Sequence, residues 1–120
     1  HLFLLRIDAP EFGAPREAVL RALQAEGIPC SAGYGYSLHQ QPLFRNQAFG
    51  PYLPRPTTRR KPAHAVCPNS DRICRDQAIW IEHNRFLGPI SDMKDIAVAF
   101  ERIHEQRDAL TDWARKQARV

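Results

Sequence analysis

The chain has 120 residues, of which 43% are hydrophobic and 25% are charged, and its formal net charge at pH 7 is +4. This length and composition are typical of one globular domain and exclude a fully disordered protein. The longest apolar runs, such as 2–5 and 96–100, are far shorter than the roughly 20 residues of a transmembrane helix. We therefore expect residues 1–120 to form a single soluble domain that does not enter a membrane.

The first part of the chain predicts two strands and a helix. Residues 2–7 are almost continuously apolar, which favours a central strand buried on both faces. Pro15 then begins a helix with apolar residues at helical spacing, and Gly27 ends it in a left-handed conformation. Residues 28–33 predict a second strand near an edge, because Pro29 cannot donate a ladder hydrogen bond.

A long proline-rich loop is predicted over residues 42–68, which hold six of the ten prolines. A connection of that length without secondary structure is usually either functional or mobile. A short helix at 67–75 and a strand at 78–83 follow, and residues 84–89 turn the chain.

The last predicted element is an amphipathic helix that begins after Ser91 as N-cap. Its apolar stripe continues towards the C-terminus through Leu110 and Trp113. Together the elements predict an α+β fold, with a small, mainly antiparallel sheet of about three strands and helices packed on one face. The expected core includes Trp80, Met93, Phe100 and Ile103.

The first residue of the chain and its cysteines indicate whether the chain is part of a longer one and in which redox compartment it lies. The sequence begins with His1 rather than methionine, and we expect it to be part of a longer chain. Three cysteines without a Cys-x-x-Cys pair predict neither a disulfide framework nor a metal site, and we expect them to be small buried residues. Their number favours the reducing cytoplasm.

Two long segments carry a family resemblance. Residues 26–44 read EGIPCSAGYGYSLHQQPLF, and residues 67–103 read CPNSDRICRDQAIWIEHNRFLGPISDMKDIAVAFERI. With the opening HLFLLRI and the helix PREAVLRALQAEG, they resemble the C-terminal small domain of the DegT/DnrJ/StrS aminotransferases. The resemblance covers residues 1 to about 105 in the right order.

The resemblance implies a role within a larger enzyme. In this family, fold-type-I aminotransferases bind pyridoxal phosphate and transfer an amino group from an amino acid to a nucleotide-linked keto-sugar, and some relatives act on cyclitols. The chain would then be the lid and substrate wall of an active site whose lysine lies in an N-terminal large domain, and the enzyme would be a homodimer of the family type. It would itself supply no catalytic residue, no cofactor-binding residue and no metal ligand.

Three residues are the candidate substrate contacts that the resemblance implies. Tyr34 and His39 match family positions at the mouth of the active site, and Tyr36 is a third candidate. Their side chains offer donors and acceptors to sugar hydroxyls. Each of these two residues has an alternative role: Tyr34 would be a hinge residue packed on the core, and His39 would tether the loop. Ser37 departs from the pattern, which often has proline there.

The net charge has a local source in the proline-rich loop. Arg59 and Arg60 belong to a basic cluster with no acidic residue between Gly50 and Ser70. They are candidate contacts for the diphosphate of a nucleotide-linked sugar, against the alternatives of a solvated loop or of nucleic-acid binding.

A function of another class is a free-standing α+β module that binds nucleic acid or protein without catalysis. The strands carry no basic-Gly-aromatic motif of the kind that RNA-recognition sheets display, which argues against nucleic acid. A purely structural role at a dimer interface is the third alternative.

Overall fold

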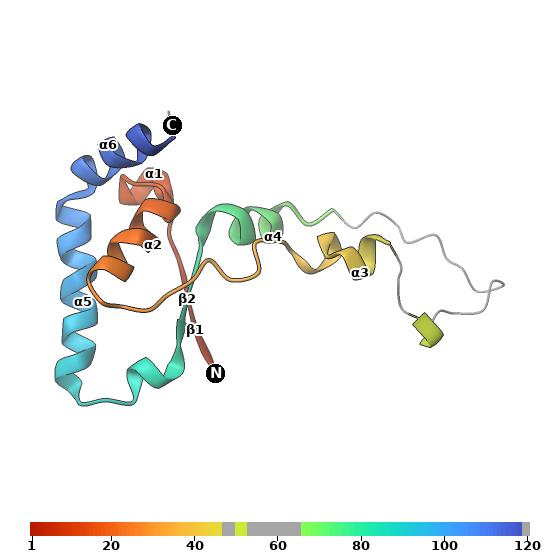
Figure 1. The fold of residues 1–120 in the computed structure, drawn as a ribbon, viewed down its shortest axis with the longest axis horizontal. Coiled ribbons are helices and arrows are strands. Elements are labelled where there is room, and N and C mark those ends of the chain that lie inside the picture. The colour runs from red at the N-terminus through yellow and green to blue at the C-terminus, as the bar shows by residue number, and fades with distance from the viewer. Residues whose placement is uncertain (47–49, 53–65, 119–120) are drawn as a thin grey trace.

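Two antiparallel strands form the sheet in the computed structural model, which describes residues 1–46, 50–52 and 66–118. Strand β1 (Leu2–Arg6) pairs with β2 (Ala78–Glu82) along its whole length, with Leu4 opposite Trp80 (Figure 1). The strands join segments more than 70 residues apart in sequence, with helices packed beside them. The predicted α+β class is therefore confirmed.

The sheet has one strand fewer than expected in the described part of the chain. At residues 28–33, only Ser31 pairs, as an isolated bridge to Trp80 with backbone N–O distances of 2.9 and 2.8 Å. Pro29 has no N–H to extend the ladder, and Gly33 then takes a φ of 74°, which turns the chain off the sheet. These two residues reduce the predicted second strand to a single bridge.

Strand β1 is not the central strand that its apolar sequence predicted. Phe3 is 48% exposed and Leu4 is 61% exposed. Strand β2 is central instead, because it pairs with β1 on one edge and with Ser31 on the other. The apolar run of β1 thus marks surface that the described residues leave uncovered, rather than burial on both faces.

Helix α2 (Arg16–Ala25) ends as the sequence predicts. Gly27 has a φ of 84°, and the Ile28 N–H donates to the Leu23 carbonyl at 2.9 Å. The Gly27 N–H donates to the carbonyl of Gln24 at 3.1 Å, which completes a Schellman motif. This turn directs the chain from α2 back towards β2.

Helix α5 (Ile90–Glu105) begins two residues earlier than expected. Pro89, not Ser91, is its N-cap, with extended backbone at ψ 163° and a carbonyl that accepts from the Asp92 N–H at 3.0 Å. The 3₁₀ turn at His83–Phe86 leads into it from β2. Within the described ranges, no helix combines the length and apolar character that crossing a membrane requires.

The predicted C-terminal stripe is divided between two helices. Helix α6 (Arg107–Gln117) starts after a break at Gln106, whose φ of −96° and ψ of 16° are not helical. Leu110 still packs on the core, but Trp113 is 43% exposed. The short helix α1 (Ala9–Phe12), which the sequence analysis did not predict, lies against α6 (Figure 1).

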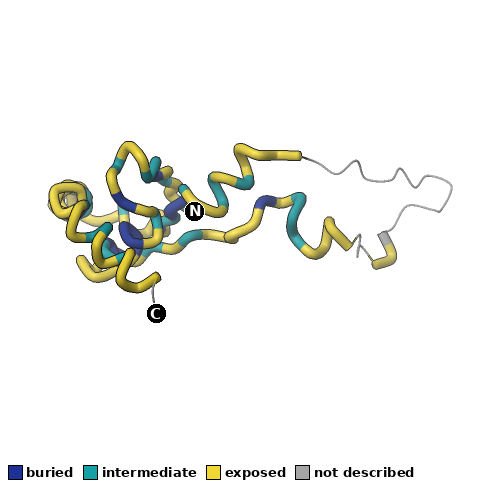
Figure 2. The backbone as a smooth tube through the Cα atoms, turned by 90° about the horizontal axis from the view of Figure 1, so that it is seen from above, coloured by how far each residue is buried: buried dark blue, intermediate teal, exposed yellow. Residues whose placement is uncertain are grey.

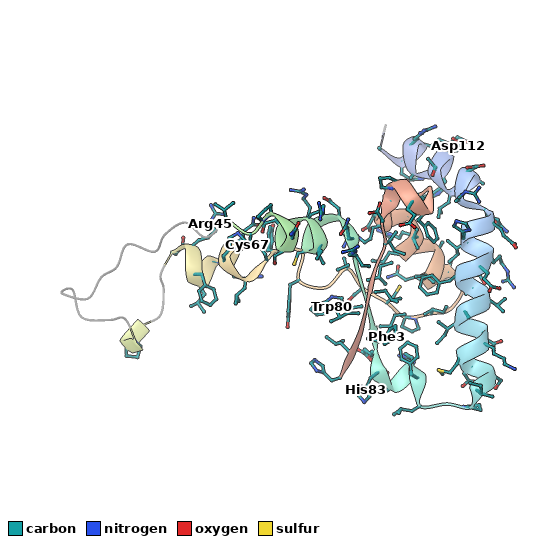
Figure 3. All side chains as sticks on the ribbon, turned by 180° about the vertical axis from the view of Figure 1, so that it is seen from behind. Phe3, Arg45, Cys67, Trp80, His83 and Asp112 are labelled. Atoms are coloured by element: carbon teal, nitrogen blue, oxygen red, sulfur yellow. The ribbon has the colours of Figure 1, made fainter. Side chains whose placement is uncertain are left out.

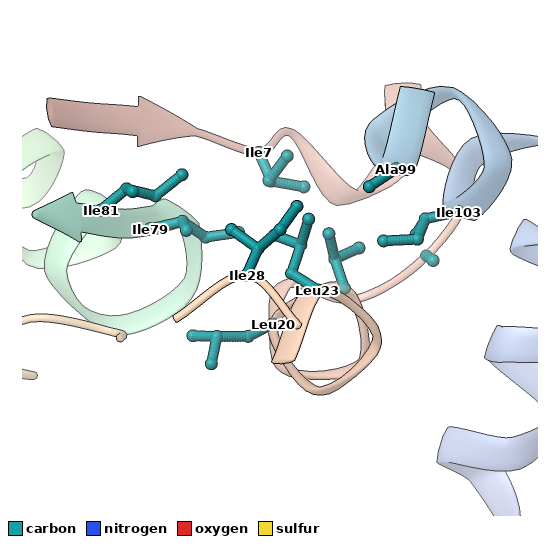
Figure 4. Packing of buried hydrophobic residues seen from close by; sticks show 10 residues of the cluster. Ile7, Leu20, Leu23, Ile28, Ile79, Ile81, Ala99 and Ile103 are labelled. Atoms are coloured by element: carbon teal, nitrogen blue, oxygen red, sulfur yellow. The ribbon is translucent and has the colours of Figure 1, made fainter. Parts of the chain in front are cut away.

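The core lies between one face of the sheet and helices α2 and α5 (Figure 4). Phe100 and Ile103 pack there as predicted, whereas Trp80 and Met93 are only half-buried and lie outside the buried cluster. Trp80 lies outside the cluster because side chains alternate between the two faces along β2, and the side chains of its neighbours point to the helices. The labelled core residues are Ile7, Leu20, Leu23, Ile28, Ile79, Ile81, Ala99 and Ile103.

An arm extends from the sheet on the side away from α5 (Figure 1). We define the arm as residues 34–46 and 66–72; it contains a 3₁₀ turn at Leu38–Gln40 and helices α3 (Pro42–Arg45) and α4 (Pro68–Arg72). Most of its residues are exposed (Figure 2).

The described parts of the predicted proline-rich loop therefore contain helical turns, including Gly50–Tyr52. Helix α4 continues as a π-helical turn at Ile73–Gln77 into β2, so the helix predicted at 67–75 is present with shifted ends.

Candidate functional site

Tyr34 lies where the arm leaves the sheet, between two glycines with positive φ. Gly33 has a φ of 74° and Gly35 a φ of 70°. The Tyr34 ring and the Trp80 indole form an edge-to-face contact, with ring centroids 4.8 Å apart and planes at 82°. Tyr34 is nevertheless 76% exposed, and nothing in the described part of the chain hydrogen-bonds its hydroxyl. Its phenol is therefore available to a ligand.

Tyr36 presents a second phenol two residues further along the same limb of the arm. It is 62% exposed, and its backbone carbonyl accepts a hydrogen bond from Gln41 Nε2 at 3.3 Å. This contact fixes the backbone at Tyr36, while the side chain stays open to solvent.

His39 belongs to a small polar cluster at the base of the arm. Its Nδ1 lies 3.1 Å from Ser37 Oγ, and its Nε2 lies 3.3 Å from Asp71 Oδ1. The Ser37 hydroxyl donates to the same Asp71 oxygen. Ser37 is 2% exposed, and the side chains of His39 and Asp71 are each 23% exposed. The cluster joins the two limbs of the arm.

This serine, histidine and aspartate do not form a hydrolytic triad. In such a triad the carboxylate lies on the far side of the imidazole and the serine donates to the histidine. Here Asp71 accepts from Ser37 directly, and Ser37 is buried too deeply to meet a substrate. Because both nitrogens of His39 face oxygens of this chain, the geometry supports its tethering alternative in this conformation.

The predicted site residues are thus only partly brought together. Tyr34, Tyr36 and His39 follow one another on the same limb of the arm, but no hydrogen bond in the described structure links His39 to either tyrosine. Arg59 and Arg60 lie outside the described residues.

The described residues do not fit a pyridoxal phosphate site. The lysines among them, Lys94 on α5 and Lys116 on α6, are both exposed, so neither offers the desolvated amine that a Schiff base needs. Lys61 lies outside the described residues. No three His, Cys, Asp or Glu side chains in the described ranges are grouped to hold a metal ion.

The cysteines differ in their surroundings. Cys30 packs against the core, its thiol donates to the Leu20 carbonyl at 3.7 Å, and burial raises the pKa of this thiol. Cys74 is half-buried, but Cys67 is exposed, so the expectation that all three are buried was wrong at Cys67. Cys67 precedes the first helical residue of α4, at the end of that helix that is further from the sheet (Figure 3).

A groove of about 390 Å³ lies between the end of α2 and helix α5. Glu26 and Arg102, which form an ion pair at 2.6 Å, line it together with Asp92 and Asp95. None of the candidate tyrosines or His39 lines this groove. It is therefore separate from the candidate site.

Sequence reasoning missed Asp71 and took Trp80 for a core residue. Asp71 is 34 positions from Ser37, and no spacing signal connects them. The contact between Trp80 and the turn at Tyr34 had a signal in the sequence. The two glycines around Tyr34 indicate a turn whose backbone approaches another group closely.

Comparisons with known proteins found two curated relatives. The chain is 32% identical over 111 residues to a Streptoalloteichus tenebrarius protein named "Putative L-glutamine:3-amino-2,3-dideoxy-scyllo-inosose aminotransferase". It is 34% identical over 106 residues to the L-glutamine:2-deoxy-scyllo-inosose aminotransferase of Streptomyces kanamyceticus. These matches cover 89% and 86% of this chain but 27% and 24% of the relatives, so the chain spans about a quarter of their length.

No protein-family profile and no solved structure matches the chain. The names of the two relatives agree with the aminotransferase part of the resemblance, and each gives an inosose as that relative's substrate.

Proposed function

We propose that this chain is the small domain of a sugar aminotransferase of the DegT/DnrJ/StrS type and forms part of its substrate-binding wall. The observation that carries the proposal is the pair of exposed phenols, Tyr34 and Tyr36, on a glycine-flanked turn. That turn belongs to a chain similar over most of its length to two aminotransferases of inososes.

The catalytic centre would lie in the remainder of the parent chain. The lysine, the acidic partner and the phosphate cradle that hold pyridoxal phosphate have no counterpart among the described residues. When bound there, the cofactor would supply the electron sink for amino transfer. The proposed partners of this domain are therefore an N-terminal large domain and the second subunit of a homodimer.

The proposed substrate is a polyhydroxylated ring ketone. Both relatives are named for inososes, which are ring ketones without a nucleotide, and for L-glutamine, our proposed amino donor. We therefore favour a cyclitol ketone over the nucleotide-linked sugar. The diphosphate contact proposed for Arg59 and Arg60 belongs to the nucleotide-linked alternative.

Each candidate residue has a defined task in this proposal. The phenols of Tyr34 and Tyr36 would each donate and accept a hydrogen bond with ring hydroxyls, and the Tyr34 face would pack on the apolar side of the ring. His39 would hold the base of the arm with Asp71. A direct substrate contact by His39 would require Nε2 to exchange Asp71 for a ring hydroxyl.

The test is a kinetic comparison in the full-length parent protein, with 2-deoxy-scyllo-inosose and L-glutamine and with amino-cyclitol formation followed by mass spectrometry. Tyr34→Phe and Tyr36→Phe each remove one hydroxyl with the hydrogen bonds that it makes to the substrate, and we expect each to raise the KM for the ketone by up to about tenfold. Trp113→Phe, on α6, is the control and should leave KM unchanged.

Transamination with unchanged KM in both tyrosine variants would refute the substrate-wall role. A parent protein that aminates no ring ketone, free or nucleotide-linked, would refute the aminotransferase proposal itself. Strongly salt-dependent RNA binding would then favour the non-catalytic module.

A further inference from the structure

We propose that Trp80 is the positioning residue for Tyr34: its indole sets the turn at residues 31–35 so that the Tyr34 phenol is presented to the substrate. This inference rests on the proposed role of Tyr34 as a substrate contact, and it assigns a task to a residue that touches no substrate itself.

Trp80 meets the turn at three successive points. Its backbone exchanges two hydrogen bonds with Ser31, at 2.8 and 2.9 Å. Gly33 passes so close to the indole that a Cβ there would lie 2.5 Å from Cε2 and 2.8 Å from Nε1. The Tyr34 ring then contacts the indole in an edge-to-face arrangement. The turn is therefore shaped around Trp80.

The position of Trp80 in β2 makes it a rigid support. Its neighbours Ile79 and Ile81 are fully buried in the core, which fixes the backbone on both sides of Trp80. Alternation along the strand places the indole on the opposite face of the sheet from Ile79 and Ile81. Figure 3 shows Trp80 and Phe3 on opposite sides of the strand pair, with Trp80 towards the arm.

Tyr34 needs such a support because it has few other contacts. A ring that is 76% exposed would otherwise exchange among rotamers, and binding would have to restrict it. An aromatic pair of this geometry changes an equilibrium by about 2- to 12-fold beyond its buried area. The indole thus reduces the ordering that the substrate would have to impose on Tyr34.

Kinetics of the full-length enzyme test the inference. Trp80→Leu is expected to raise the KM for the ring ketone by about 2- to 12-fold with kcat within about twofold, because it affects binding rather than chemistry. Trp80→Phe should restore most of the affinity, since phenylalanine can also form an edge-to-face pair. In a Tyr34→Leu background, Trp80→Leu should have no further effect on KM.

An equal rise in KM with and without the Tyr34 ring would show that Trp80 acts only on general structure, and would overturn the inference. So would a Trp80→Leu enzyme with unchanged KM.

A second readout does not depend on activity. In protein labelled with 5-fluorotryptophan, the fluorine resonance of Trp80, identified by its absence in Trp80→Phe, should shift in Tyr34→Leu, while that of Trp113 should not. An unchanged Trp80 resonance overturns the inference. A shifted resonance with unchanged KM in Tyr34→Leu overturns the substrate role of Tyr34, while the Trp80–Tyr34 contact stands.

Discussion

At the scale of single residues, the two glycines beside Tyr34 have the same backbone conformation but different surroundings. Gly33 and Gly35 both have positive φ. A Cβ on Gly33 would meet the Trp80 ring, whereas a Cβ on Gly35 would have nothing within 4 Å. Comparing the same substitution at both glycines therefore separates the cost of backbone strain from the cost of a clash with the indole.

We expect Gly35→Ala to lower the free energy of unfolding by about 1 kcal/mol, the cost of a left-handed alanine. Gly33→Ala should cost about 1 to 3 kcal/mol more, because the new methyl group must displace Trp80 or the turn. Urea denaturation of the two variants measures the difference. Equal losses would mean that the indole does not pack on Gly33 in solution.

The thiols give a pH-dependent prediction. Burial favours the neutral thiol and so raises the pKa of Cys30. Its thiolate therefore forms only at a higher pH than that of an ordinary thiol. Because the thiolate is the reactive form, Cys30 should be alkylated by iodoacetamide more slowly than the exposed Cys67. Its rate should keep rising at pH values above the pKa of an ordinary thiol. Peptide mass spectrometry measures the rates at both cysteines, and a Cys30 that is alkylated as fast as Cys67, or whose own rate levels off at the ordinary thiol pKa, would contradict the prediction.

At the scale of elements, Arg16 connects the start of α2 to the segment that enters β2. Its Nη1 donates to the Ala78 carbonyl at 3.1 Å, and its Nη2 donates to the Arg75 carbonyl at 2.6 Å. Arg21, on the same helix, forms an ion pair with Glu17 at 3.7 Å in which both side chains are mostly exposed. The first arginine joins two elements, and the second joins two turns of one helix.

Arg16→Met should therefore lower the free energy of unfolding by about 1 to 3 kcal/mol, since two carbonyls lose a charged donor. The matched variant Arg21→Met should change it by less than about 0.5 kcal/mol. Thermal or urea unfolding distinguishes them. If both variants lost the same stability, the Arg16 bonds would contribute no more than a surface ion pair.

The elements that sequence reasoning predicted well are those fixed by local pattern. Gly27 marks the end of α2 because only a left-handed residue fits there, and the apolar spacing of α5 survives in the packing of Ile103. Local pattern could not indicate which group covers an apolar strand, so β1 was placed at the centre of the sheet. The link between Asp71 and Ser37 was equally hidden, since it depends on how the arm folds.

At the scale of the whole molecule, apolar surface remains on the sheet and at the start of α5. The side chains of Phe3 and Leu4 on β1 are about half exposed, and those of Leu87 and Ile90 are about three-quarters exposed. In the described structure β1 pairs along one edge only, and an open edge with apolar side chains favours association with another chain.

We expect the 120-residue chain on its own to self-associate as its concentration rises, which sedimentation velocity measures directly. Leu4→Lys should weaken the association, because a lysine on an edge strand opposes pairing. Val98→Lys, at an exposed apolar position on α5, is the control and should not weaken it. A chain that stays monomeric at every concentration would contradict the prediction.

The hydrogen bond between Ser37 and Asp71 also bears on how the sequence can vary. It joins residues 34 positions apart and so fixes both ends of the intervening segment independently of that segment's length. The entropy of closing a flexible loop grows only logarithmically, by about 0.6 kcal/mol for each doubling of its length. Insertions between α3 and α4, which leave Ser37, His39 and Asp71 in place, should therefore cost less stability than substitutions of Ser37 or Asp71, and this makes the connection between the two helices a suitable place to graft a peptide.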